Sequence, residues 1–140
     1  MTSPEVYSLF VYGSLRSGFR SPAYDYISHF FQFIIEAKVK GKLYDMSDYP
    51  AAVPTSEDSY IIGELYKIKD AKEFSWAIGQ LDDYEGVNVE AGQPQLYRRE
   101  LVDVYVGTDT TPAWIYWFNG DVSGRPVVES GDVIEYLQKK

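Results

Sequence analysis

Hydrophobic residues along the chain gather in short runs that are rich in β-branched and aromatic side chains and that end at glycine, proline or polar residues. Runs of this kind are typical of β-strands. The predicted strands are the run that ends at Gly13 and residues 34–44, 51–54, 60–68, 96–106 and 113–118. Residues 113–118 are apolar on both faces, which indicates a strand covered from both sides. Gly41 predicts a bulge or bend within the second strand.

The spacing of apolar residues changes to a helical one in the middle of the chain. Phe74, Ile78 and Leu81 recur at intervals of four and three residues, so an amphipathic helix is predicted from about Ala71. Gly86 is suited to end this helix, because glycine readily adopts the left-handed conformation that follows a last helical turn. Two shorter helices are predicted at residues 23–31 and 130–137.

Five or six strands combined with two or three short helices predict an α+β fold. The strands follow one another too irregularly for a doubly wound parallel sheet, so a small mixed β-barrel or a strongly curled sheet with a few short helices is favoured. A chain of 140 residues suits one domain with a substantial core. We therefore expect a single domain over residues 1–140.

Composition restricts the chemistry of the protein more than its fold. The net charge of −8 is spread along the chain and argues against partners such as nucleic acid or anionic membranes. The absence of cysteine removes disulfides, thiolate catalysis and cysteine-based zinc sites. His29 is the single histidine, so a metal site built from several histidines is excluded. Acid–base chemistry then falls to a carboxylate, a lysine or a tyrosine.

Targeting and nucleotide-binding signals do not appear in the sequence. No apolar run reaches the ~18 residues that a membrane helix needs, and the first residues lack the basic segment of a signal peptide. The motifs GxxxxGK[ST], GxGxxG and GxSxG do not occur either. The sequence thus predicts a cytoplasmic protein with no membrane partner and no metal site.

Glu85 is a candidate for acid–base catalysis because of its position on the central helix. It follows Leu81 by four residues, which places it on the apolar side, whereas Asp82 and Asp83 are predicted to fall away from that side. The negative end of the helix dipole and burial both disfavour a charged carboxylate there. Such a carboxyl group is suited to accept and return a proton. The alternative is a solvated glutamate at a frayed helix end.

The loop after the first strand is a candidate anion site. Residues 13–16 present successive backbone amides that no strand partner needs, and amides arranged in this way can bind a carboxylate or a phosphate. The alternative is an ordinary turn from strand to loop. Aromatic residues in the strands, such as Tyr12, Tyr97 and Tyr116, are typical of a core but can also line a pocket. For residues 97–100 an ordinary charged strand surface is favoured over an anion site.

Several short motifs resemble those of the gamma-glutamylcyclotransferase-like family, and they occur in that family's order. In this sequence they are Val11-Tyr12-Gly13-Ser14-Leu15-Arg16, Gly41-Lys42-Leu43-Tyr44-Asp45 with Tyr49-Pro50, Gly63-Glu64-Leu65-Tyr66, Leu81-Asp82-Asp83-Tyr84-Glu85-Gly86, Tyr97-Arg98-Arg99, Ala113-Trp114-Ile115-Tyr116 and Ser130-Gly131-Asp132. Each motif is weak alone, but together they form a specific signal. The Tyr-Gly-Ser-Leu-Arg form resembles the branch that acts on gamma-glutamylamines and its bacterial relatives.

The resemblance implies a small mixed barrel with a cavity at one end and an enzyme of the lyase or acyltransferase type. It implies that residues Tyr12, Gly13, Ser14 and Leu15 hold a gamma-glutamyl substrate, partly by backbone amides, and that Glu85 is the general acid/base. It also places Tyr116 near the substrate and Tyr97 at the wall of the pocket. The implied reaction releases 5-oxoproline and needs no cofactor.

Two other functions are compatible with the same residues. A binding module would keep the cavity and bind a gamma-glutamyl or amino-acid-like ligand without turnover. A hydrolase would use water as the attacking group and release free glutamate. The sequence makes no prediction for the leaving amine or for the oligomeric state.

Overall fold

The computed structural model describes residues 6–12, 22–46, 50–85, 97–128 and 131–132. Within them the strands are β1 (Ser8–Val11), β2 (Phe31–Asp45), β3 (Pro50–Pro54), β4 (Tyr60–Ile68), β5 (Tyr97–Val106) and β6 (Asp109–Phe118). The helices are α1 (Pro22–Phe30), the short 3-10 helix η2 (Ala71–Glu73) and α2 (Phe74–Glu85). All six predicted strands and the first two predicted helices are confirmed. The helix predicted at 130–137 lies outside the described residues, apart from Gly131 and Asp132.

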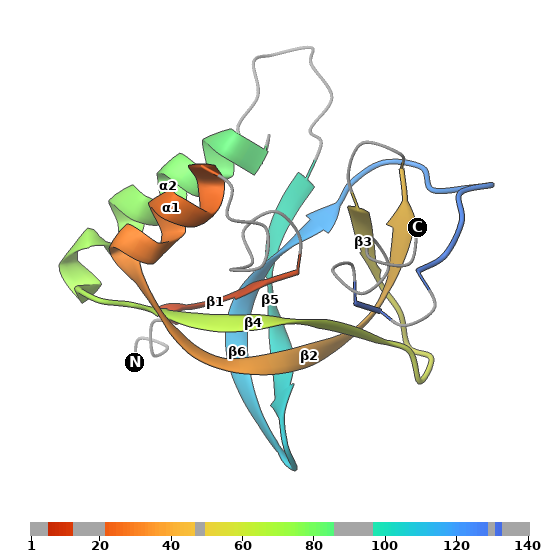
Figure 1. Cartoon of the computed structure of the whole chain (residues 1–140), viewed down its shortest axis with the longest axis horizontal. Coiled ribbons are helices and arrows are strands. Elements are labelled where there is room, and N and C mark those ends of the chain that lie inside the picture. Colours follow the sequence, from red (N-terminus) through yellow and green to blue (C-terminus); the bar gives the residue numbers. More distant parts are fainter. Residues whose placement is uncertain (1–5, 13–21, 47–49, 86–96, 129–130, 133–140) are drawn as a thin grey trace, which may run out of the picture.

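The strands form a barrel of mixed direction (Figure 1). Their order is β3-β2-β4-β1-β6-β5, and an additional pairing of β2 with β5 at Lys38 and Tyr105 closes the sheet on itself. β3 stays outside the closed ring as an extension of β2. β1 runs parallel to β6 through the pair Leu9 and Trp114, whereas the other pairings among these strands are antiparallel. The predicted small mixed barrel is confirmed.

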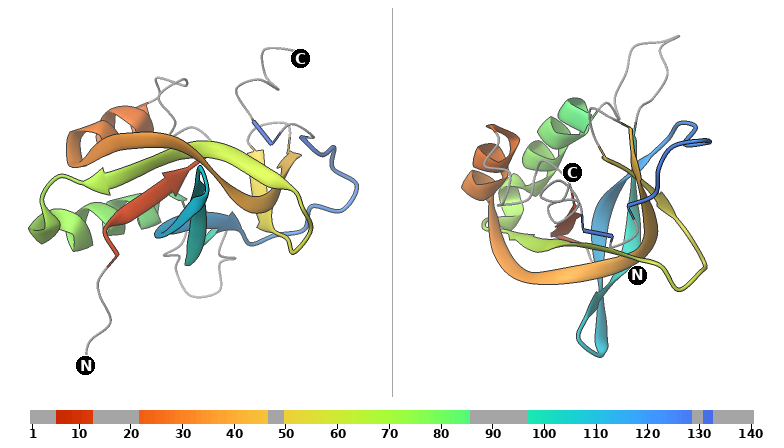
Figure 2. Two further views of the ribbon diagram at one scale, coloured as in Figure 1. Left: turned by 90° about the horizontal axis from the view of Figure 1, so that it is seen from below. Right: turned by 45° about the vertical axis from the view of Figure 1, so that its right-hand side comes forward.

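Side chains alternate across the barrel wall and divide the core into two clusters. Along β1 and the residue that follows it, Leu9 and Val11 belong to one cluster, and Phe10 and Tyr12 belong to the other. The first cluster includes residues of α1 and α2, so it lies between the barrel wall and the helices. The second contains no helix residue and fills the barrel. Figure 2 shows both helices on the same outer side of the barrel.

The two helices pack against each other as well as against the barrel. The Tyr26 hydroxyl on α1 donates a hydrogen bond to the Ala77 carbonyl oxygen on α2, with 3.3 Å between the two oxygens. The rings of Phe30 and Trp76 lie 5.3 Å apart between their centroids. Burial raises the pKa of Tyr26, so its hydroxyl stays protonated and able to donate this bond.

Gly41 does not form a bulge, although Figure 1 shows β2 as one strongly curved strand, as predicted. It pairs with Pro54 in a regular ladder, and the shift of register on β2 lies between Phe33 and Ile35. A Cβ atom on Gly41 would lie 2.6 Å from Cδ1 of the buried Ile61 and 3.0 Å from the Val53 carbonyl oxygen, so a side chain would be crowded here. The sequence did not indicate this crowding because the neighbours that cause it are distant along the chain.

Gly63 on β4 is required by a close approach to the end of β1. A Cβ atom there would lie 2.2 Å from the Val11 carbonyl oxygen, which is main chain and cannot move aside cheaply. We expect Gly63→Ala to lower the free energy of unfolding by about 1–3 kcal/mol, as overpacking does. Gly79→Ala on α2 is the matched control, because a Cβ atom there meets nothing within 4 Å. Chemical denaturation should show no loss for this control and a gain of up to about 1 kcal/mol; equal stability of the two variants would contradict the prediction.

Candidate active site

Tyr12 anchors the start of the predicted substrate-binding loop. It follows β1 directly, its side chain is buried, and its hydroxyl donates a hydrogen bond to the Tyr116 carbonyl oxygen on β6, 2.5 Å away. Gly13, Ser14 and Leu15 lie outside the described residues. The structure therefore fixes where this loop begins.

Glu85 is the last residue of α2. Its main chain is described, whereas its side chain lies outside the description. Leu81, four residues earlier, is buried at 2% exposure, so the helix face that carries position 85 is the one that packs inward. The predicted catalytic residue thus has a defined place in the fold, at the end of a helix packed on the barrel.

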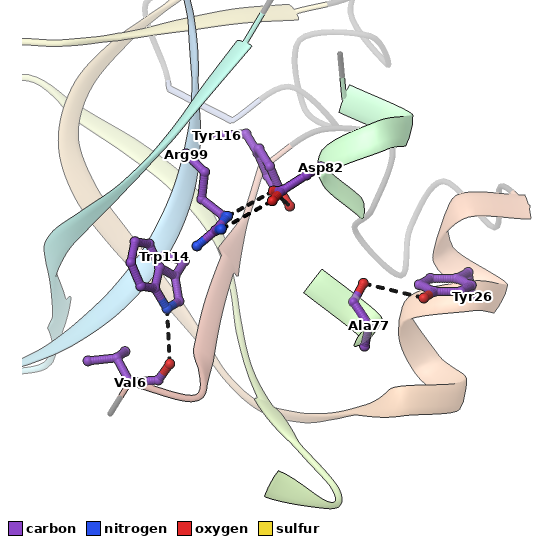
Figure 3. A network of polar contacts seen from close by, with 7 residues as sticks. All are labelled: Val6, Tyr26, Ala77, Asp82, Arg99, Trp114 and Tyr116. Carbon is purple, nitrogen blue, oxygen red and sulfur yellow. Dashed lines mark hydrogen bonds and ion pairs between the residues drawn. The ribbon is translucent and has the colours of Figure 1, made fainter. Parts of the chain in front are cut away.

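Asp82 corrects the prediction that it falls away from the buried face of α2. It is only 6% exposed, and its carboxylate accepts three hydrogen bonds (Figure 3). Arg99 donates two of them, from Nε to Oδ1 at 2.8 Å and from Nη2 to Oδ2 at 3.1 Å. The Tyr116 hydroxyl donates the third to Oδ1 at 2.8 Å. The buried face of α2 is therefore wider than its apolar residues indicate, because polar groups of Arg99 and Tyr116 pack against the helix and bind Asp82.

Arg99 corrects a second prediction, that residues 97–100 form an ordinary charged surface. Besides its ion pair with Asp82, its guanidinium carbon lies 4.5 Å from the centre of the Trp114 ring, a cation–π contact. Trp114 in turn donates from Nε1 to the Val6 carbonyl oxygen at 2.9 Å. We call Asp82, Arg99, Tyr116 and Trp114 the Asp82 cluster. Through Val6 and Tyr12, this cluster is bonded to both ends of β1.

The spacing of residues contained a signal for this cluster. Asp82 follows the buried Ile78 by four residues, which is the helical interval that brings two side chains to one face. Arg99 follows the buried Tyr97 by two residues, which places both on one face of β5. Each signal becomes informative only once the partner on the other element is known.

The two remaining predicted site tyrosines are buried. Tyr116 is 3% exposed, with its hydroxyl on Asp82 and its carbonyl oxygen on Tyr12. Tyr97 is 7% exposed and packs edge-on against Phe118, with ring centroids 5.6 Å apart. Tyr12 and Tyr116 are therefore in direct contact, and Tyr97 lies on the same barrel face as Tyr116, in the core cluster that α2 covers.

A second buried carboxylate, which was not among the candidate site residues predicted from the sequence, lies beside the end of β1. Glu64 on β4 is 6% exposed, pairs with Val11 in the ladder and accepts a hydrogen bond from the Tyr66 hydroxyl at 2.8 Å.

Among the described residues, no three carboxylate or imidazole groups come together as metal ligands would. In the same part of the chain, no helix has the length and apolar character needed to cross a membrane.

Comparison with known families identifies the family to which this chain belongs. The family described as gamma-glutamyl cyclotransferase, AIG2-like, matches residues 9–135. The chain belongs to this family. The matched residues include the end of β1 and the end of α2, and family membership supports an enzyme of the gamma-glutamylcyclotransferase type.

Individual members of the family resemble this chain over most of its length. MJ1514 of Methanocaldococcus jannaschii, whose name refers to gamma-glutamylcyclotransferase, is 32% identical over 131 residues, which cover 91% of this chain and 96% of that protein. The crystal structure of YkqA from Bacillus subtilis superimposes with a TM-score of 0.67 at 26% identity; it covers 94% of this chain, but only 42% of the YkqA chain is matched. An AIG2-like protein from Mus musculus has the same fold, with a TM-score of 0.66 at 20% identity over 90% of this chain and 88% of its own.

Proposed function

We propose that this protein is a cofactor-independent cyclotransferase that releases 5-oxoproline from a gamma-glutamyl amine or a gamma-glutamyl peptide. In addition to the family assignment, one structural observation supports this proposal. The Asp82 cluster bonds the last turn of α2, which ends at Glu85, to the residue that opens the predicted substrate loop, Tyr12. The elements that carry the two predicted halves of the site are thus joined to each other by hydrogen bonds.

In the proposed reaction the substrate attacks itself. Backbone amides of residues 13–15 bind the carboxylate of the glutamyl group. Glu85, ionised at the start, accepts a proton as the α-amine attacks the γ-carbonyl carbon, and it delivers a proton to the departing nitrogen as the amide bond breaks. A five-membered lactam and a free amine result, with no change in oxidation state. Holding the substrate in a conformation suited to this intramolecular attack lowers the activation barrier by roughly 7–11 kcal/mol in favourable cases.

Among the carboxylates at the end of α2, Asp82 is less suited than Glu85 to act as the acid/base. Its carboxylate is buried, is paired with the Arg99 guanidinium and accepts hydrogen bonds at both oxygens, which favours a structural role. Asp83 is exposed and lies on the solvent side of the helix. Tyr12 and Tyr97 are proposed to shape the substrate pocket. The absence of cysteine fits a reducing compartment, and we place the reaction in the cytoplasm.

The proposal is tested by product analysis over a panel of gamma-glutamylamines, gamma-glutamyl dipeptides and glutathione. We expect 5-oxoproline and the free amine in equal amounts from at least one gamma-glutamyl compound, at a rate that a chelator leaves unchanged. Free glutamate in place of 5-oxoproline would show hydrolysis by water. Thermal stabilisation by a panel compound without any product would show a binding module. Either result would overturn the cyclotransferase assignment.

A further inference from the structure

The Asp82 cluster connects the two elements that carry the halves of the proposed site. Asp82 is on the last turn of α2, Arg99 is on β5, and Tyr116 is on β6 (Figure 3). Both oxygens of the buried carboxylate are engaged by donors from the barrel wall. We propose that Asp82 is the positioning residue of this enzyme: it fixes the rotation of the end of α2, and with it position 85, relative to the end of β1. This inference rests on the proposed function of Glu85.

On the helix side, a directional contact is needed in addition to apolar packing. Ile78 and Leu81 bury α2 against the barrel, but apolar contact is not directional and leaves rotation and sliding of a helix weakly restricted. A bidentate ion pair between Arg99 and a carboxylate restricts both the distance and the angle between the two groups. Position 85 lies three residues beyond Asp82 on the same helix, so it is its near neighbour on the helix surface. Fixing Asp82 therefore fixes the main chain that carries the proposed acid/base.

On the loop side, the cluster compensates for a short strand pairing. β1 meets β6 in parallel through a single registered pair, Leu9 and Trp114. Trp114 bonds to Val6 before β1, and Tyr116 receives the hydroxyl of Tyr12 after it. The same cluster thus sets the position of β1 at both ends, including the residue from which the substrate loop departs.

This arrangement gives Tyr116 a different role from the substrate contact implied by the family resemblance. A phenol has one hydrogen to donate, and in this structure it is donated to Asp82. The Tyr116 hydroxyl is therefore inferred to act on catalysis through Asp82. Removing it should change the rate of the chemical step more than the affinity for substrate.

Arg99→Lys tests the proposal, with Arg98→Lys as its matched control. Lysine keeps the positive charge but cannot form the bidentate ion pair with Asp82. Arg98, the preceding residue, contacts Asn119 and Glu100 instead of the Asp82 cluster. Because misplacement of a catalytic group by about 1 Å can lower a rate about 100-fold, we expect kcat of Arg99→Lys to fall by about 10- to 100-fold with KM changed less than about threefold. Arg98→Lys should keep the kcat of the parent protein.

Tyr116→Phe, alone and combined with Arg99→Lys, separates positioning from substrate contact. If both residues act through Asp82, kcat of the double variant should be little lower than kcat of the less active single variant, because the effects of substitutions that share a partner are not additive. Multiplied losses, or an effect of Tyr116→Phe confined to KM, would overturn the inferred role of Tyr116.

A readout that needs no turnover distinguishes failure of this proposal from failure of the proposed function. Backbone amide exchange over residues 82–85 should accelerate in Arg99→Lys and remain unchanged in Arg98→Lys. If the parent protein releases no 5-oxoproline from the panel, the cyclotransferase assignment fails, whatever the exchange data show. If the parent is active and Arg99→Lys keeps both its kcat and its slow exchange, the positioning role of Asp82 is overturned while the function stands.

Discussion

Glu85→Gln is expected to bind a gamma-glutamyl ligand and to release almost no 5-oxoproline. The substitution keeps the size and shape of the side chain at the end of α2. The amide cannot accept a proton from the attacking amine and return it to the leaving nitrogen, and a general acid/base contributes about 10²- to 10⁴-fold to a rate. We therefore expect kcat to fall by about 10²- to 10⁴-fold, measured as 5-oxoproline formed per enzyme under saturating substrate.

The matched control for this variant is Asp83→Asn. Asp83 lies on the same last turn of α2 and is exposed, so neutralising it changes the local charge by the same amount at a side chain that faces solvent. We expect this control to turn over at close to the parent rate. Calorimetric titration with a gamma-glutamyl ligand should show retained binding for Glu85→Gln. Turnover that persists in Glu85→Gln would remove Glu85 from the mechanism and leave the family fold without its predicted acid/base.

The strands were predictable because their signals are local. The bounds predicted for β4 agree with the structure, since its run of apolar residues ends at polar or charged residues on both sides. The hairpin between β5 and β6 also has a local signal, because only Gly107 and Thr108 separate the two strands and glycine is typical of such turns; Gly107 adopts a positive φ of 62° there. How the strands pair is a different matter. The closure of β2 onto β5 and the parallel pairing of β1 with β6 join segments far apart in sequence, and no local pattern encodes them.

Local patterns suggest the parts of the candidate site, whereas no local pattern suggests the contacts between them. Glu85 is proposed from helical spacing, and the loop after β1 is proposed from a strand that ends at glycine. The ion pair of Asp82 with Arg99 crosses from a helix to a strand, and each residue alone resembles an ordinary surface charge. Only tertiary packing makes them partners. The same reason applies at Gly41, where no bulge forms and the crowding that favours glycine comes from Ile61 on another strand.

Removing the carboxylate of Asp82 should have the largest effect on stability among these substitutions. In Asp82→Ala the guanidinium of Arg99, only 23% exposed, loses its counter-charge and the Tyr116 hydroxyl loses this acceptor. Breaking a buried ion pair on one side costs about 3–5 kcal/mol, and the partial exposure of Arg99 places the expected loss near the lower value. For a chain of this size the melting temperature should fall by roughly 10 °C.

Asp83→Ala isolates the buried carboxylate from the effect of adding alanine to a helix. Both substitutions gain the same small increment of helix propensity, about 0.5 kcal/mol, so a larger loss in Asp82→Ala reports what the buried carboxylate contributes beyond the exposed one. A further variant, Asp82→Ala with Arg99→Met, removes both charges and leaves an apolar side chain against Trp114. Because replacing a buried pair by apolar residues is often close to neutral, this double variant should regain most of the stability that Asp82→Ala loses. Recovered stability without recovered 5-oxoproline release would show that the ion pair serves geometry at the site more than folding, whereas equal instability of the single and double variants would show that the unpaired charge is not the cause of the loss.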